Sequence, residues 1–168
     1  MAINWRADKA WSDQFIPTIK GIIGPKLLMV SRLEKEDALE ATDLIILKAK
    51  DMRIACRVRR PGFARKYYSQ FTIRSERDSG TKTELRKFME GYGDWMFYGH
   101  STGNGVEISP WYLLDLDIFR QYCKTHKDKI RYGKQPNGDG THFTWFDIDS
   151  FPVNLVIGCS TESYELML

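Results

Sequence analysis

An acidic residue followed by a group of arginines marks the stretch from Asp43 to Arg60. Asp43 precedes the apolar run Leu44 to Ala49. A second apolar run, Met52 to Val58, follows Lys50-Asp51 and leads into arginines. Carboxylate oxygens are ligands for Mg²⁺, and arginine guanidinium groups bind phosphate in charge-assisted pairs. The stretch therefore predicts two strands in a hairpin that either holds a metal and a phosphodiester or binds an anion without cutting it.

The second of these strands carries its arginines on one face. Successive side chains of a strand point to opposite faces. One face then holds Ile54, Cys56 and Val58, and the other holds Arg53, Ala55, Arg57 and Arg59. Charged side chains on an interior strand are costly unless they meet anions or water. The next alternating run ends in Arg74, so we predict phosphate binding by Arg53, Arg57, Arg59 and Arg74.

A second candidate anion site precedes a well-marked helix. Thr81 and Glu84 have the spacing of a capping box, and the apolar stripe Leu85, Phe88 and Met89 ends before Gly91. Backbone N–H groups at a helix start favour an anion, and Arg77 and Lys82 supply positive charge nearby. A plain capping loop is the more frequent explanation for such a string, and an anion site is the alternative.

Aromatic residues and one histidine are further candidates. Phe63, Tyr67 and Tyr68 lie among Arg59, Arg60, Arg65 and Lys66, a composition that suits stacking of bases and neutralisation of a phosphate backbone. The same aromatic side chains could instead cover the core. His100 is either an acid or base, or a hydrogen-bonded structural histidine.

Composition narrows the class of protein. The 168 residues are 42% hydrophobic, which predicts a single domain over 1–168. No apolar run is long enough for a membrane span, and the three scattered cysteines suit a reducing cytoplasm. Between Lys48 and Lys87, 13 basic residues face 4 acidic ones, whereas the rest of the chain has a net charge of −6. This segregation favours a partner that carries phosphate.

The remaining pattern predicts the elements around these residues. Residues 5–23 suit a helix that is interrupted near Pro17, and residues 27–30, 95–98 and 111–114 suit strands. Asp115 or Asp117 should cap a further helix, and 124–140 should be a long connection without regular structure. Residues 143–148 and 153–157 are short apolar strands. The fold class expected is α+β (α/β-like), with a central mixed β-sheet flanked by helices.

The sequence resembles two groups of known proteins. Glu40-Ala-Thr-Asp-Leu44, followed by Ile54-Ala-Cys-Arg-Val-Arg59, resembles the core of the PD-(D/E)XK nuclease superfamily over about residues 5–100, with about 101–168 as a C-terminal strand and helix extension. The resemblance implies Mg²⁺ at Asp43, and a second acid and a lysine on the next strand. Here that strand offers Arg57 and Arg59 instead, so a second acid would come from Glu40 or Glu84. The strings Arg-Val-Arg-Arg, Phe-Thr-Ile-Arg and Gly-Asp-Trp-Met-Phe-Tyr-Gly-His are similar to those of small phage and prophage proteins.

The sequence therefore supports three hypotheses. The first is a divergent Mg²⁺-dependent endonuclease with Asp43, Glu40 and Glu84 as its acids. The second is a nucleic-acid-binding protein on the same scaffold, which binds DNA or RNA without a cofactor. The third is a phage or prophage factor that binds a host or virion protein through its basic face. Each predicts a protein of the cytoplasm, that of the host if the chain is phage-encoded, with no membrane partner.

Overall fold

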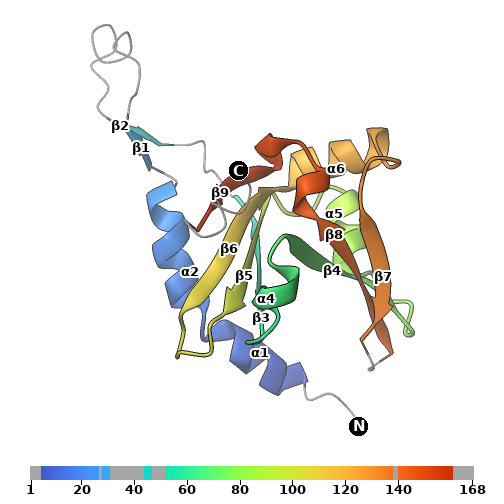
Figure 1. The fold of residues 1–168 in the computed structure, drawn as a ribbon, viewed down its shortest axis with the longest axis horizontal. Helices are drawn as coiled ribbons and strands as arrows, with labels where there is room; N and C mark the ends of the chain where they lie inside the picture. Colours follow the sequence, from blue (N-terminus) through green and yellow to red (C-terminus); the bar gives the residue numbers. More distant parts are fainter. Residues whose placement is uncertain (1–4, 27, 31–43, 47–51, 138–139, 161–168) are drawn as a thin grey trace, which may run out of the picture.

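The computed structural model describes residues 5–26, 28–30, 44–46, 52–137 and 140–160. In chain order the helices and strands are α1 (Trp5–Asp13), α2 (Ile16–Ile23), β1 (Leu28–Val30), β2 (Leu44–Ile46), β3 (Ile54–Arg59), α4 (Ala64–Tyr67), β4 (Gln70–Arg77), α5 (Glu84–Met89), β5 (Trp95–Ser101), β6 (Ile108–Asp115), α6 (Leu116–Thr125), β7 (Tyr132–Pro136), β8 (Thr141–Asp147) and β9 (Val156–Cys159) (Figure 1). The expected α+β class is confirmed, because a mixed sheet and a second, antiparallel sheet occur together with helices.

The principal sheet has four strands in the order β3-β5-β6-β9. Strand β3 pairs in parallel with β5, and the other two pairings are antiparallel. A second, antiparallel sheet has the order β4-β8-β7, and β1 pairs with β2 in a separate two-stranded ribbon. The connection from β3 to its parallel neighbour β5 runs through α4, β4 and α5. This crossover places the second sheet and α5 together on one face of the principal sheet.

Apolar side chains cover both faces of the principal sheet. On one face Phe97 of β5 packs with Phe15 and Ile19 from the N-terminal helices. On the other, Met96 and Tyr98 pack with residues of the second sheet and α6. Figure 1 shows this layering, with α2 and β4-β8-β7 on opposite sides of β5 and β6. A strand that is buried on both faces has a continuous apolar sequence. Residues 95–98 have such a sequence, and the strand predicted there is confirmed as part of β5.

The predicted hairpin between Leu44–Ala49 and Met52–Val58 is wrong. In the described residues β2 pairs with β1, whereas β3 pairs with β5 in a different sheet. Strand β3 is also at the edge of its sheet rather than in its interior. An edge strand gives its polar side chains a route to solvent, which allows Arg57 and Arg59 on this short strand. The predicted alternation holds, because Val58 and Ile54 pack against one cluster and Ala55 against the other.

The predicted unstructured connection at 124–140 is also wrong. Residues Tyr132–Pro136 form β7, which pairs with β8 from Tyr132 opposite Phe146 to Pro136 opposite His142. This edge strand lacks apolar alternation, so its composition resembles a loop. Gly133 allows the close pairing, since a Cβ there would lie 2.7 Å from the Trp145 ring.

Two local predictions agree with the structure. The N-terminal helical segment is interrupted before Pro17, with α1 ending at Asp13 and α2 beginning at Ile16. The Asp115 carboxylate caps α6 by accepting hydrogen bonds from the backbone N–H groups of Asp117 at 2.8 Å and Ile118 at 3.0 Å. Both signals depend on neighbouring residues only.

Candidate functional site

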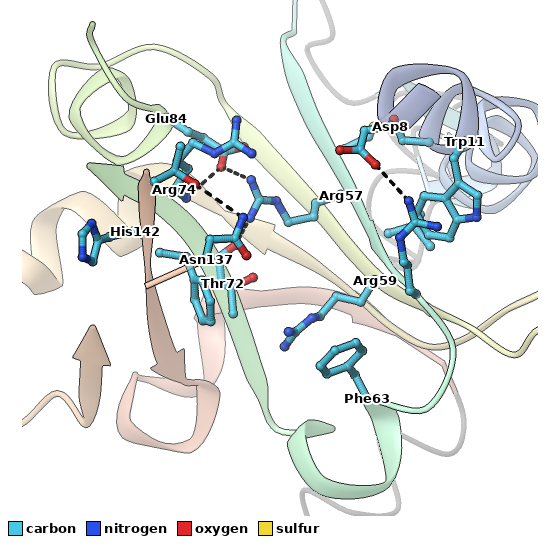
Figure 2. Close-up of a pocket in the computed structure, with 16 residues that line it drawn as sticks. Asp8, Trp11, Arg57, Arg59, Phe63, Thr72, Arg74, Glu84, Asn137 and His142 are labelled. Atoms are coloured by element: carbon cyan, nitrogen blue, oxygen red, sulfur yellow. Dashed lines mark hydrogen bonds and ion pairs between the residues drawn. The ribbon is translucent and has the colours of Figure 1, made fainter. Parts of the chain in front are cut away.

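A cleft of about 440 Å³ opens between α1, β3 and the β4-β8-β7 sheet. Helix α1 contributes Asp8 and Trp11 to one side, and His142 lies on the other (Figure 2). The side chains of Arg57 and Arg59 extend from β3 between these walls. Alternation along β3 places both arginines on the same face, as the sequence predicts.

Two further hollows adjoin the cleft. One shares Asp8, Ser12 and Arg74 with it, and the other shares Arg57, Arg74 and Glu84. Together the three hollows are lined by three acidic side chains and eight basic ones. We call the basic set the basic surface: Lys9, Arg57, Arg59, Arg60, Arg74, Arg77, Lys82 and Lys87. The excess of positive charge thus spans three adjoining hollows.

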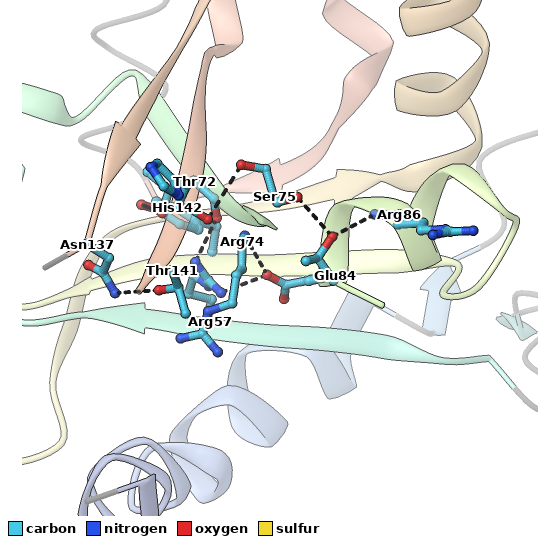
Figure 3. Close-up of polar contacts among 11 residues, drawn as sticks. Arg57, Thr72, Arg74, Ser75, Glu84, Arg86, Asn137, Thr141 and His142 are labelled. Atoms are coloured by element: carbon cyan, nitrogen blue, oxygen red, sulfur yellow. Dashed lines mark hydrogen bonds and ion pairs between the residues drawn. The ribbon is translucent and has the colours of Figure 1, made fainter. Parts of the chain in front are cut away.

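An ion pair with Glu84 positions Arg57. The Nη2 atom of Arg57 donates to Oε2 of Glu84 at 2.7 Å, and Nη1 donates to the Thr72 carbonyl at 3.2 Å. The same Glu84 oxygen accepts the backbone N–H of Arg74 at 3.2 Å (Figure 3). The two side chains are 26% and 27% exposed. Glu84 therefore orients Arg57 toward the cleft and offsets part of its charge.

Arg59 stacks on aromatic rings. Its guanidinium carbon lies 4.2 Å from the centroid of the Phe63 ring and 5.9 Å from that of Tyr67. No carboxylate forms an ion pair with Arg59 in the part of the chain that the structure describes. The guanidinium is thus held over a ring while its charge stays available to an anion.

His100 lies directly opposite Arg59 on the neighbouring strand β5 and is 0% exposed. Neither ring nitrogen has a hydrogen-bond partner among the described residues, which differs from the hydrogen-bonded alternative expected from sequence. Burial, with a smaller contribution from the charge of Arg59, lowers the pKa of His100 from 6.5 to about 4. The ring is therefore neutral at pH 7 and adds no charge to the cleft.

Arg60 joins the end of β3 to α1. Its Nη2 atom lies 2.9 Å from Oδ1 of Asp8, and its guanidinium carbon is 4.6 Å from the centroid of the Trp11 ring. The two contacts fix one wall of the cleft against the strand that carries Arg57 and Arg59.

The structure separates some residues that the sequence grouped. Arg53 lies at the other end of β3, where its Nε atom is 3.5 Å from Oδ2 of Asp94, and it lines none of the hollows of the basic surface. Lys82 pairs with Glu90 at 2.7 Å while lining one hollow, and Arg77 lines two. Asp43 and Glu40 lie outside the described residues.

The cap of α5 is Thr83, so the prediction of Thr81 is wrong. Thr83 Oγ1 accepts the backbone N–H of Arg86 at 3.5 Å, whereas Thr81 Oγ1 bonds the hydroxyl of Ser79 at 3.0 Å. Glu84 is then the first residue of the helix and pairs with Arg57 instead of closing a capping box. The apolar stripe is confirmed, with Phe88 buried and Leu85 and Met89 packed against the core.

The described residues do not fit a Mg²⁺ site. No three His, Cys, Asp or Glu side chains are grouped to hold a metal in the ranges that the structure describes. Glu84 is the one predicted acid within those ranges, and its Oε2 atom already accepts from Arg57 and Arg74. A metal ion bound at this oxygen would have to displace the Arg57 guanidinium. The roles of Asp43 and Glu40 stay predictions.

The residues that form the walls of the cleft are not among those predicted from the sequence. Asp8, Lys9 and Ser12 recur at helical spacing on α1, and this polar face was the signal available. His142 and Phe143 reach the site only because β8 pairs with β4. Lys87 lies one turn after Glu84, on the face of α5 that borders the basic surface.

Comparison with known proteins leaves the site to be interpreted from its own chemistry. No protein family, characterised protein or solved structure matches this chain.

No helix in the described ranges is long and apolar enough to cross a membrane. Cys56, Cys123 and Cys159 are all free thiols.

Proposed function

We propose that the protein binds nucleic acid through the basic surface. The observation that supports this most strongly is the convergence of eight basic side chains from α1, β3, β4 and the α5 region on three adjoining hollows. Proteins bind a polynucleotide backbone largely by neutralising successive phosphates with lysine and arginine. Three acidic side chains in the same hollows offset only part of the charge.

The arginines differ in how directly they can contact a phosphate. Arg57 is engaged by Glu84 and the Thr72 carbonyl, so it supports the site and contributes part of its charge. Arg59 has aromatic neighbours but no paired carboxylate among the described side chains, and Arg77 is exposed where two hollows meet. We therefore expect Arg59 and Arg77 to contact phosphate directly.

We predict that Arg77→Gln weakens nucleic-acid binding and reduces its salt dependence. Loss of one phosphate contact lowers the slope of log affinity against log salt concentration by about 0.7–0.9. The measurement is fluorescence anisotropy of a labelled oligonucleotide at several salt concentrations. Lys124→Gln is the matched control, because Lys124 is exposed on α6 and lines none of these hollows.

Binding that does not change with salt would contradict the proposal, as would equal slopes for the two variants. Capture of a single protein partner in place of nucleic acid would favour the alternative of a phage or prophage interaction factor. That alternative uses the same basic surface against an acidic protein.

A second prediction separates binding from cleavage. Glu84→Gln should increase affinity about 5-fold, because it removes one negative charge from the site, and a charge at close range contributes about 1 kcal/mol in water. Glutamine can still accept the hydrogen bond from Arg57, so the geometry is retained. The measurement is the same anisotropy titration, at fixed salt.

Asp128→Asn serves as its control, since Asp128 is exposed and outside the hollows of the basic surface. An unchanged affinity in Glu84→Gln would contradict the electrostatic role assigned to this carboxylate. If the chain is instead a Mg²⁺-dependent nuclease that uses Glu84, this substitution should abolish divalent-dependent cleavage without raising affinity.

A further inference from the structure

Phe63 exposes a large apolar ring inside a basic cleft. It precedes α4, follows Gly62 at φ 92°, and is 40% exposed. Its side chain belongs to neither hydrophobic core cluster. The alternative that this aromatic residue covers the core therefore does not account for its position.

The guanidinium of Arg59 stacks on one face of the Phe63 ring. The guanidinium carbon of Arg59 is 4.2 Å from the ring centroid, and the Tyr67 ring lies 6.5 Å from that of Phe63. Figure 2 shows Arg59 and Phe63 side by side, across the cleft from Asp8 and Trp11. An aromatic ring next to a positively charged planar group is the arrangement on which nucleobases stack in proteins that bind single strands.

The size of the cleft limits what can reach the Phe63 ring. A volume of about 440 Å³ is within the range of cavities that bind small molecules. A single nucleotide is a molecule of this size. In a duplex each base is also stacked on its neighbours, so its face is not available to a side chain. Unpaired bases have free faces.

We infer that the protein prefers single-stranded nucleic acid and that a base stacks on Phe63. This inference rests on the proposed function and adds the substrate class. In this arrangement the base stacks on the face of the Phe63 ring opposite Arg59, and the charge of Arg59 is directed to the adjoining phosphate. The rest of the basic surface continues the path of the strand toward Arg74 and Arg77.

The test compares a short oligothymidylate with an abasic oligonucleotide of the same length, which keeps the phosphates and lacks the bases. The wild-type protein should bind the oligothymidylate about 10-fold more tightly than the abasic strand, as expected for loss of one stacked base. Phe63→Leu should lose this preference and bind both strands with the lower affinity. Affinities are measured by anisotropy, and circular dichroism confirms that the variant is folded.

Tyr132→Leu is the matched control and should keep the wild-type preference, because Tyr132 is 48% exposed but lines a different groove. Phe63→Trp should also keep it, since indole presents a larger stacking face. Equal binding of the two strands by the wild-type protein would overturn the inference, as would a preference that survives in Phe63→Leu. In either case salt-dependent binding would leave the proposed function standing, whereas failure to bind any oligonucleotide would refute the proposed function itself.

Discussion

Replacing Phe71 with alanine is expected to lower the free energy of unfolding by about 3–5 kcal/mol, the usual cost of removing a buried aromatic ring. Phe71 of β4 is 1% exposed. Its ring centroid lies 5.3 Å from Phe146, 5.8 Å from Phe119 and 6.4 Å from Tyr98. The ring thus joins the second sheet to the principal sheet and to α6. Urea denaturation followed by circular dichroism measures the change.

The same substitution at an exposed phenylalanine gives the control. Phe63→Ala removes an identical ring that is 40% exposed, so it should cost less than about 1 kcal/mol. Equal losses in the two variants would contradict the assignment of Phe71 to the centre of the core. A typical domain is stable by only about 5–15 kcal/mol. The Phe71→Ala protein should therefore be studied at low temperature.

Acid is expected to destabilise the fold through His100. Its pKa is lowered from 6.5 to about 4, mainly by burial and then by Arg59, the charged side chain opposite it on β3. Below pH 6.5 the unfolded chain binds a proton that the folded chain does not accept until the pH approaches 4. Protons in this window therefore favour unfolding, by about 3 kcal/mol in total for this shift.

His100→Leu should abolish this contribution, so that its stability falls less than that of the wild-type protein between pH 7 and pH 4. At neutral pH the variant should be at least as stable as the wild type, because both ring nitrogens lack hydrogen-bond partners among the described residues and leucine removes them. Urea midpoints across the pH range measure both effects. Identical pH profiles for the two proteins would show that the ring is not kept neutral by the fold.

The parts of the fold that the sequence predicts are those with local or periodic signals. Strands β5 and β6 are apolar on both faces, and Asp115 needs only its next three residues to form a cap. The sequence carries no such signal for which strand pairs with which. The run at Leu44–Ile46 is equally apolar whether it pairs with β3 or with β1, so the pattern alone cannot decide between them. Strand β7 was missed because an edge strand needs no apolar face.

The candidate site shows the same division. Period-2 spacing correctly places Arg57 and Arg59 on one face of β3. The partner of Arg57 is Glu84, which is 27 residues away and belongs to a helix. No spacing rule connects the two residues, and the helix signal gave Glu84 a different role. Asp8 and His142 come from still more distant elements, which only the tertiary fold brings to the cleft.

The ion pair between Arg60 and Asp8 is expected to weaken as ionic strength rises. The Arg60 and Asp8 side chains are 56% and 57% exposed, so their ion pair is accessible to screening by salt. Such a pair contributes at most about 1 kcal/mol and less as salt rises. Under the proposed function, added salt should then weaken both the phosphate contacts and the ion pair between α1 and the end of β3. The salt dependence of binding should therefore include a contribution from this ion pair, which Asp8→Asn removes together with one negative charge of the cleft.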